Sequence, residues 1–334
     1  MLIEFDNNTS YFQRIEQYQS LRDSILFCGR PNEIIMLTKE LIDLYSRTKN
    51  WQKVDAEFKF GMSYSKINSE SSSIVSLKLT YANYLRLKSE FNFAIDLFIS
   101  CYYEAKKIKS EQFCYDALSG LAEIYRIKGM NNYALKIHIY LIKKFKHIRN
   151  YKGEIWAMLG IAQIYRIQGD FEKSLYHYST CLKICERNND FKNLAFAKKG
   201  FGESLALLYK SSASIENILE SIELFKNVGY FIGEGYSYKT LGDVSRILKK
   251  NYDAYDSARH SYEIFKHSNY LTGLNYAIKG LADSHVQFGL FENAKNYYLI
   301  AGDYFFLNKI NYGYSQCIEA LNNITYGRKK SQIF

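Results

Sequence analysis

The chain contains little proline and no paired cysteine motif. Pro31 is the only proline in 334 residues, and because proline interrupts helix interiors, its scarcity favours long helices. The six cysteines are scattered and none forms a CxxC pair, which excludes a zinc ribbon and a disulfide framework. No apolar run approaches the length of about 18 residues that spans a bilayer. The first residues carry acids and no basic segment before an apolar run, so we expect no secretory signal, no membrane partner and a cytoplasmic location.

Motifs that indicate catalysis are also missing. The sequence has no HExxH, GxSxG or GxxxxGK[ST] motif, and Gly200-Phe201-Gly202 lacks the third glycine of a dinucleotide-binding loop. Cys181 and Cys185 are four residues apart, but a single imidazole, His177, is near them in sequence. We therefore expect no enzymatic activity, no bound metal and no cofactor.

The residues that are present indicate a large folded core. Hydrophobic residues make up 47% of the chain and aromatic residues 16%, which excludes a disordered protein. The length is near the ceiling of about 250–300 residues for a single core, so two domains or a repeat array are expected. A pattern recurs every forty residues, most plainly in residues 117–129 and 157–169. Seven units result, which start at residues 31, 71, 111, 151, 191, 231 and 271.

Each unit has the pattern of a helix hairpin. Apolar and small residues recur at three- and four-residue spacing, stop at a glycine or a polar turn, and then resume. One column of small residues lies in the first helix of the units and another in the second, with Leu141 as an exception in the second. Small residues at these positions would let the two helices approach closely. The columns are Ala82, Ala122, Ala162, Gly202, Gly242 and Ala282 in the first helix, and Gly61, Cys101, Cys181, Ser221, Ser261 and Ala301 in the second.

The order of residues in a unit resembles the tetratricopeptide repeat (TPR). It is visible in Ala162, Tyr165, Gly169, Phe171 and Ser174, which follow the order small, aromatic, turn, aromatic, small. The forty-residue period exceeds the usual 34 and is similar to the extended variety found in bacterial regulators and in kinesin light chain. The closing proline of the family is missing from every unit. The resemblance implies an all-α protein, a right-handed α-solenoid of about seven TPR-like helix hairpins with terminal capping helices, roughly 16 helices in all.

The resemblance also suggests how the chain is organised. We expect an N-terminal capping helix within residues 1–30, seven repeats over residues 31–310, a C-terminal capping helix over residues 311–326 and a basic tail at residues 327–334. Capping helices cover the apolar ends of a repeat stack. The array is expected to be continuous, with no segment left over for a second domain.

In TPR arrays the inner face of the first helices lines a concave groove, and here that face can be read repeat by repeat. It has an acidic or amide row, a basic row three residues later, a lysine row and an aromatic row. The predicted binding residues are Asn83, Glu123, Gln163, Glu203, Asp243 and Asp283; Arg86, Arg126, Arg166 and Arg246; Lys199, Lys239 and Lys279; and Trp156, Phe196, Tyr236 and Tyr276.

Two interpretations of these rows stay open. Pairs such as Glu123 with Arg126 are three residues apart and would contribute only about 0.2–0.5 kcal/mol each on a solvated helix. Alternatively, the cations hold carboxylates of a bound segment while the rings contact its apolar side chains, because arginine favours carboxylates and aromatic residues are typical interface anchors.

The net charge of +10 raises the question of nucleic acid. Much of it lies near the ends of second helices, as at Lys143 and Lys144, where cations complement the helix dipole. Nucleic acid is therefore disfavoured as a partner. We predict a non-catalytic adaptor or scaffold that binds a protein or peptide with carboxylates and apolar anchors in the groove. The alternatives are a regulator whose superhelix changes shape on binding a signalling peptide, and a substrate-recruiting subunit of an enzyme complex. The oligomeric state is left open.

Overall fold

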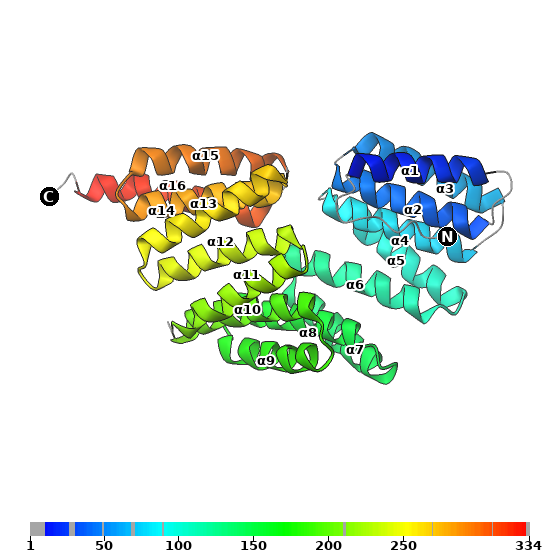
Figure 1. Ribbon diagram of the computed structural model, residues 1–334, viewed down its shortest axis with the longest axis horizontal. Coiled ribbons are helices and arrows are strands. Elements are labelled where there is room, and N and C mark those ends of the chain that lie inside the picture. Colours follow the sequence, from blue (N-terminus) through cyan, green and yellow to red (C-terminus); the bar gives the residue numbers. More distant parts are fainter. Residues whose placement is uncertain are drawn as a thin grey trace. The chain divides into compact units, whose positions relative to one another are not determined.

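The computed structural model describes residues 11–26, 31–48, 50–67, 71–88, 90–209, 212–268, 270–308 and 310–331. These segments form sixteen helices, and no strand occurs among them (Figure 1). The helices are α1 Tyr11–Ile25, α2 Pro31–Arg47, α3 Trp51–Ile67, α4 Ser71–Leu87, α5 Phe91–Lys107, α6 Glu111–Ile127, α7 Asn131–His147, α8 Tyr151–Ile167, α9 Phe171–Arg187, α10 Phe191–Tyr209, α11 Ala213–Asn227, α12 Phe231–Ile247, α13 Asn251–His267, α14 Leu271–Gln287, α15 Phe291–Leu307 and α16 Asn311–Ser331.

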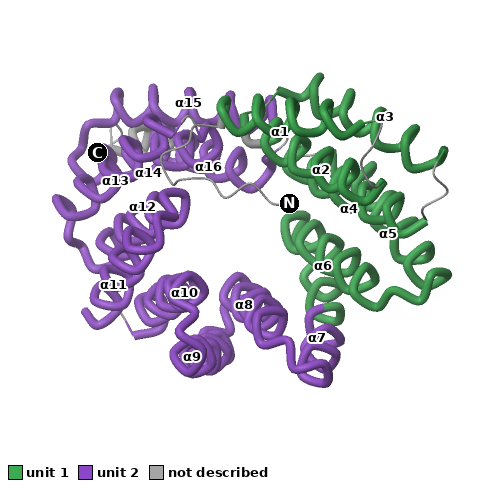
Figure 2. Tube along the Cα trace, turned by 45° about the vertical axis from the view of Figure 1, so that its right-hand side comes forward, with its two compact units in different colours: residues 1–137 green, residues 138–334 purple. Residues whose placement is uncertain are grey.

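The chain divides into two compact units, residues 1–137 and residues 138–334 (Figure 2). The boundary falls inside α7. We refer to them as unit 1 and unit 2 and describe each by itself.

Unit 1 is built around three first helices, α2, α4 and α6, which contact one another in sequence order. The second helices α3 and α5 pack against these, and α1 packs on α2. Tyr18 of α1 is buried, as its place in the second-helix pattern predicts, and Arg22 of α1 forms an ion pair with the buried Glu57 of α3. Phe98 and Leu41 are fully buried in the shared core.

Unit 2 repeats this arrangement with more hairpins. Its first helices α8, α10, α12 and α14 contact one another in order, and α9, α11, α13 and α15 pack between and behind them (Figure 2). The last helix, α16, packs on α15 and buries Cys317 completely. The surface formed by α8, α10, α12 and α14 is called the first-helix face of unit 2 below.

The turns follow from local sequence. Gly129, Gly169 and Gly289 come two residues after a first helix ends and have φ values of 74°, 82° and 75°, a left-handed conformation that ends helices and costs glycine least. At the start of α8 the side chain of Asn150 accepts a hydrogen bond from the backbone N–H of Gly153, and Asp170 caps α9 in the same way.

The small columns have the role that the sequence predicts. Ala82 and Ala162 are fully buried. At Gly202 an added Cβ would lie 2.7 Å from the backbone oxygen of Ser214 on the partner helix of the hairpin, so the two backbones approach closely. Leu141, the large exception in the second column, is also fully buried.

The predicted fold class is confirmed: the protein is an all-α array of TPR-like helix hairpins. The first helices begin at residues 31, 71, 111, 151, 191, 231 and 271, and α16 continues to Ser331. The division into caps, seven repeats and a tail stays a prediction, and the side chains beyond residue 325 lie outside the described residues. None of the helices in the described segments is both long and apolar enough to cross a membrane.

Candidate functional site

The predicted binding residues of unit 2 lie on its four first helices, and every one of them is partly exposed. This follows from the repeat, because residues that share a position in successive units lie on the same face of successive parallel helices. Partial exposure leaves each polar head within reach of a partner while its stem packs against the hairpin.

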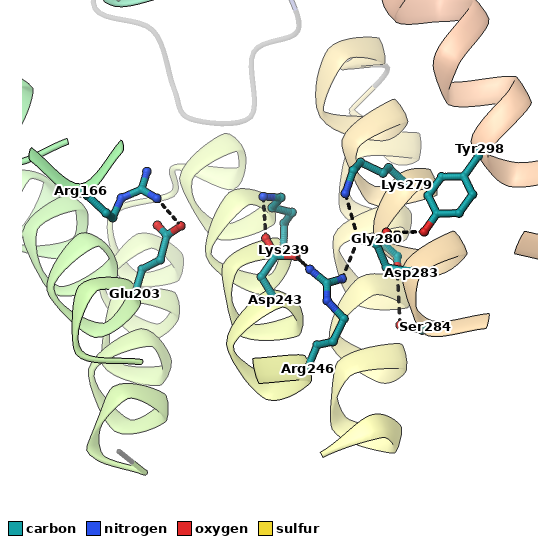
Figure 3. Close-up of polar contacts among 10 residues, drawn as sticks. All are labelled: Arg166, Glu203, Lys239, Asp243, Arg246, Lys279, Gly280, Asp283, Ser284 and Tyr298. Carbon is teal, nitrogen blue, oxygen red and sulfur yellow. Dashed lines mark hydrogen bonds and ion pairs between the residues drawn. The ribbon is translucent and has the colours of Figure 1, made fainter. Parts of the chain in front are cut away.

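A network of charged side chains joins α12 to α14 (Figure 3). Arg246 binds two carboxylates at once: Nη2 lies 2.8 Å from Oδ1 of Asp243, and Nη1 lies 2.6 Å from Oδ2 of Asp283. Lys239 is 2.6 Å from Asp243, and Lys279 is 2.9 Å from Asp283. The hydroxyl of Tyr298 on α15 donates to Oδ1 of Asp283 over 2.6 Å. Asp283 therefore accepts from three side chains on three helices.

The same inter-repeat contact occurs between α8 and α10. Arg166 Nη1 lies 2.7 Å from Oε1 of Glu203 (Figure 3), which repeats the Arg246–Asp283 spacing of 37 residues. The sequence interpretation considered pairs within one helix and missed this link. The spacing could have predicted it. An arginine three residues after the acidic residue of one repeat lies 37 residues before the acidic residue of the next, because the repeat is forty residues long.

This network shifts the pKa values of its members. Burial alone would lower the pKa of Arg246, but Asp243 and Asp283 outweigh burial and raise it. Burial likewise would raise the pKa of Asp243, yet Lys239 and Arg246 hold it well below its ordinary value. These side chains are therefore charged across the physiological range.

The aromatic row packs more tightly than the sequence suggests. The ring centroid of Phe196 lies 4.9 Å from that of Phe225, and the ring centroid of Tyr276 lies 4.7 Å from that of Phe305. Tyr236 makes the equivalent contact with Phe265, and Trp156 packs instead on His138 of the preceding helix, α7.

Two lysines of the lysine row lie above these rings. The ammonium of Lys199 is 5.6 Å from the ring centroid of Phe196 and 5.8 Å from that of Tyr236, and the ammonium of Lys239 is 6.0 Å from that of Tyr276. The rings thus stabilise cations at the surface. Whether they also hold a partner's apolar side chains stays a prediction.

In unit 1, two pairs of the predicted binding residues are in contact, each pair within a single helix. Arg126 Nη2 lies 2.7 Å from Oε2 of Glu123 within α6, and Arg86 Nη2 is 3.5 Å from Oδ1 of Asn83 within α4. These are the i,i+3 pairs that the first of the two sequence interpretations expects.

The two cysteines that are four residues apart lie in the interior of unit 2. Cys181 and Cys185 are fully buried, and burial raises the pKa of Cys185 to about 12, so its thiol stays protonated and is a poor metal ligand. Burial also lowers the pKa of His177. Among the residues that the structure describes, no three His, Cys, Asp or Glu side chains are grouped so that they could hold a metal ion.

On the first-helix face of unit 2, the predicted residues carry five cations and three carboxylates. The cations are Arg166, Lys199, Lys239, Arg246 and Lys279, and the carboxylates are Glu203, Asp243 and Asp283. Within the described segments, Nε of Arg166 also has no hydrogen-bond acceptor. The arrangement therefore favours an anionic group by charge, and guanidinium donors can receive a carboxylate in a planar geometry.

Fold and site together define a helical-repeat protein with a charged first-helix face. No family model matches the sequence, and no curated protein is similar to it in sequence. Solved structures do share its fold. A Rap protein complexed with competence and sporulation factor has a TM-score of 0.65 at 11% identity over 96% of both chains. The apo form of RapI has a TM-score of 0.60 at 14% identity, over 95% of this chain and 97% of that one.

A third similar structure carries the repeat in its name. A signal transduction ATPase with numerous domains and a tetratricopeptide repeat sensor, from Pyrococcus horikoshii, matches with a TM-score of 0.57 at 15% identity, over 96% of this chain and 56% of that one. The resemblance to tetratricopeptide-like helical repeats is thus confirmed at the level of fold.

Proposed function

We propose that this protein is a non-catalytic adaptor or scaffold whose first-helix face in unit 2 binds an acidic peptide or protein segment. The observation that carries the proposal is the excess of partly exposed cations over carboxylates on that face. The cations are held in place before any partner binds, by the contacts of Arg246 with two carboxylates and of Lys199 with two rings. Preorganised side chains lose less conformational entropy on binding, which improves affinity.

The three carboxylates on the same face make an acidic segment with spaced charges a better partner than a continuous phosphate backbone. Glu203, Asp243 and Asp283 would repel phosphates that pass over them, whereas a peptide can place its carboxylates beside Lys199 and Arg166. A protein or peptide is therefore the proposed partner, and nucleic acid is not. Metal and cofactor have no role in the proposed binding. The five described cysteines are free thiols, which suits the proposed cytoplasmic location.

A regulator that responds to a signalling peptide is the second candidate. The similar Rap structure, which covers 96% of this chain, is a complex with competence and sporulation factor, and this supports a ligand-binding role for a fold of this kind. In that case, binding would change the spacing of the repeats and thereby the affinity for another protein.

The test uses two matched double variants. Arg166→Gln with Lys199→Gln removes two cations from the first-helix face, and Lys143→Gln with Lys144→Gln removes the same charge from α7. Proteins captured from a lysate by the parent are identified, and the affinity of the purified partner, or of its acidic segment, is measured for each variant. We expect the first double variant to bind at least about tenfold more weakly and the second to bind like the parent. The reverse result would place the binding surface on the second helices.

The two candidate functions differ in a second measurement. Small-angle X-ray scattering of the parent with and without its partner segment reports the repeat spacing. Unchanged dimensions favour the scaffold, and a compaction on binding of the segment favours the regulator.

A further inference from the structure

Unit 1 contains a pocket on its own first helices, away from the residues discussed so far. Its volume is about 170 Å³ and its walls come from α2, α4 and α6. A cavity of about 150 Å³ is large enough for a benzene ring, so this pocket has room for one side chain or a small acid.

One wall of the pocket is polar. Lys39 on α2 donates from Nζ to Oγ of Ser76 on α4 over 2.6 Å, and Ser73 donates from Oγ to Oδ1 of Asn32 over 2.9 Å. Lys39 is the single charged residue that lines it. The pocket therefore presents an ammonium group beside hydroxyl groups.

Other residues that line the pocket are apolar. Met36 on α2 and Phe113 on α6 line it, and both side chains are partly exposed. A thioether and a ring edge pack well against an aromatic or branched apolar group. Ligands that combine an anionic end with an apolar body match both the polar and the apolar lining residues.

The described carboxylates of unit 1 offset the charge of Lys39 only in part. Among the described residues no carboxylate lies within ion-pair distance of its ammonium. Burial lowers its pKa, and the negative charges of Glu40 and Asp116 offset that effect only in part. A bound anion would supply the missing countercharge, because an opposite charge at short range favours the protonated amine.

We propose that this pocket binds a carboxylate carried on an apolar body, with Lys39 and Ser76 holding the carboxylate and Met36 and Phe113 holding the apolar part. One lysine balances the single negative charge of a carboxylate, whereas a phosphate carries a charge of about −1.5 to −2. The carboxylate can come from the free end of a peptide, from an acidic side chain or from a small acid. The site lies in unit 1 and does not rest on the function proposed for unit 2.

The experiment measures binding of N-acetylphenylalanine by calorimetry or by chemical-shift perturbation, with N-acetylphenylalaninamide as the uncharged match. Lys39→Met removes the charge and keeps the length of the side chain. Ser76→Phe fills the pocket with a ring of the kind that Phe196 supplies at the same repeat position in unit 2. Lys59→Met, on the exposed surface of α3, is the control for net charge. Far-ultraviolet circular dichroism checks that each variant is folded.

We expect the acid to bind at least about tenfold more tightly than its amide, Lys39→Met to abolish that preference, Ser76→Phe to abolish binding, and Lys59→Met to leave it unchanged. Equal affinity for acid and amide, parent-like binding in Lys39→Met, or no binding at about 10 mM probe overturns the proposal. If Ser76→Phe does not fold, the affinities of Lys39→Met for the acid and for the amide test the proposal.

Further probes identify the source of the carboxylate. A short peptide that ends in phenylalanine and binds more tightly than the free acid points to a peptide terminus, and tighter binding of N-acetylglutamate N-methylamide points to an acidic side chain. Inorganic phosphate that displaces N-acetylphenylalanine at lower concentration than acetate does would overturn the assignment to carboxylates.

Discussion

The same position of the forty-residue repeat is filled differently in the two units. In unit 2 it carries the rings of Trp156, Phe196, Tyr236 and Tyr276, which pack on aromatic side chains of the second helices. In unit 1 it carries Met36, Ser76 and Asp116, and a pocket of about 170 Å³ lies beside the first two. The small columns inside the hairpins persist in both units while this surface column changes. Helix packing therefore restricts the interior positions, and the first-helix surface is free to diverge.

The charged side chains show a second difference. In unit 2, Arg166 and Arg246 each join two first helices through a carboxylate of the next repeat. In unit 1, Arg22 and Lys78 pair with carboxylates on other helices, but neither pair joins two first helices, and the Glu123–Arg126 pair lies within α6. An ion pair between helices ties two repeats together, whereas a pair within one helix supports only that helix.

The largest effect is expected at the centre of the unit 2 network. Asp283 accepts from Arg246, Lys279 and Tyr298 and its side chain is 12% exposed, so Asp283→Ala leaves two cations and a hydroxyl without this acceptor. Allowing for partial solvent screening, we expect a loss of about 2–3 kcal/mol in the free energy of unfolding, measured by urea denaturation. Arg126→Ala in unit 1, which removes an ion pair within α6, should cost less than about 1 kcal/mol. Equal costs would remove the distinction between the two units.

Gly200 and Gly280 share a repeat position but should respond differently to substitution by alanine. At Gly200 an added Cβ would be 2.2 Å from the Tyr178 ring, whereas at Gly280 it would be 3.5 Å from Ala258. Because Tyr178 is buried, Gly200→Ala should destabilise the protein by about 1–2 kcal/mol through overpacking. Gly280→Ala should instead gain about 0.5 kcal/mol from the better helix propensity of alanine. Thermal or urea unfolding of both variants checks this, and a gain in Gly200→Ala would contradict the packing described for this position.

Lysines at the same repeat position should behave differently in the two units. Lys239→Met removes an ion pair with Asp243 and should cost about 1 kcal/mol. Lys39→Met removes a charge that burial disfavours, so it should change the free energy of unfolding by no more than about 0.5 kcal/mol, in either direction. Urea midpoints of the two variants test this. A larger cost for Lys39→Met would mean that its charge is already balanced in unit 1.

The smallest effect concerns pH. The pKa of Asp243 is depressed in the folded protein, so its contribution is complete above its unfolded pKa of about 3.9 and is lost as the pH falls below that value. At near-neutral pH, the free energy of unfolding should therefore not depend on the ionisation of Asp243. Below about pH 4, the parent should lose stability more steeply than Asp243→Asn does. Parallel acid titrations of the urea midpoint measure the difference, and identical slopes would contradict the depressed pKa.

The forty-residue period was sufficient to predict the fold class and the core. Columns of small residues such as Ala82 and Ala162 recur at fixed positions, and only close packing of two helices requires small residues there. The sequence also predicted which residues lie on the first-helix surface, because equivalent residues of successive repeats lie on one face. Local pairs, such as Glu123 with Arg126, follow from helix geometry alone.

Only the tertiary structure decided which of those surface residues bind one another. The distance between α8 and α10 determines that Arg166 reaches Glu203, and the second-helix column determines how far the rings of Phe196 and Tyr276 are covered. The pocket beside Lys39 is likewise a property of three helices at once. A sequence pattern records which face a side chain occupies, but the contacts of that side chain depend on the size of residues from other repeats, which only packing brings together.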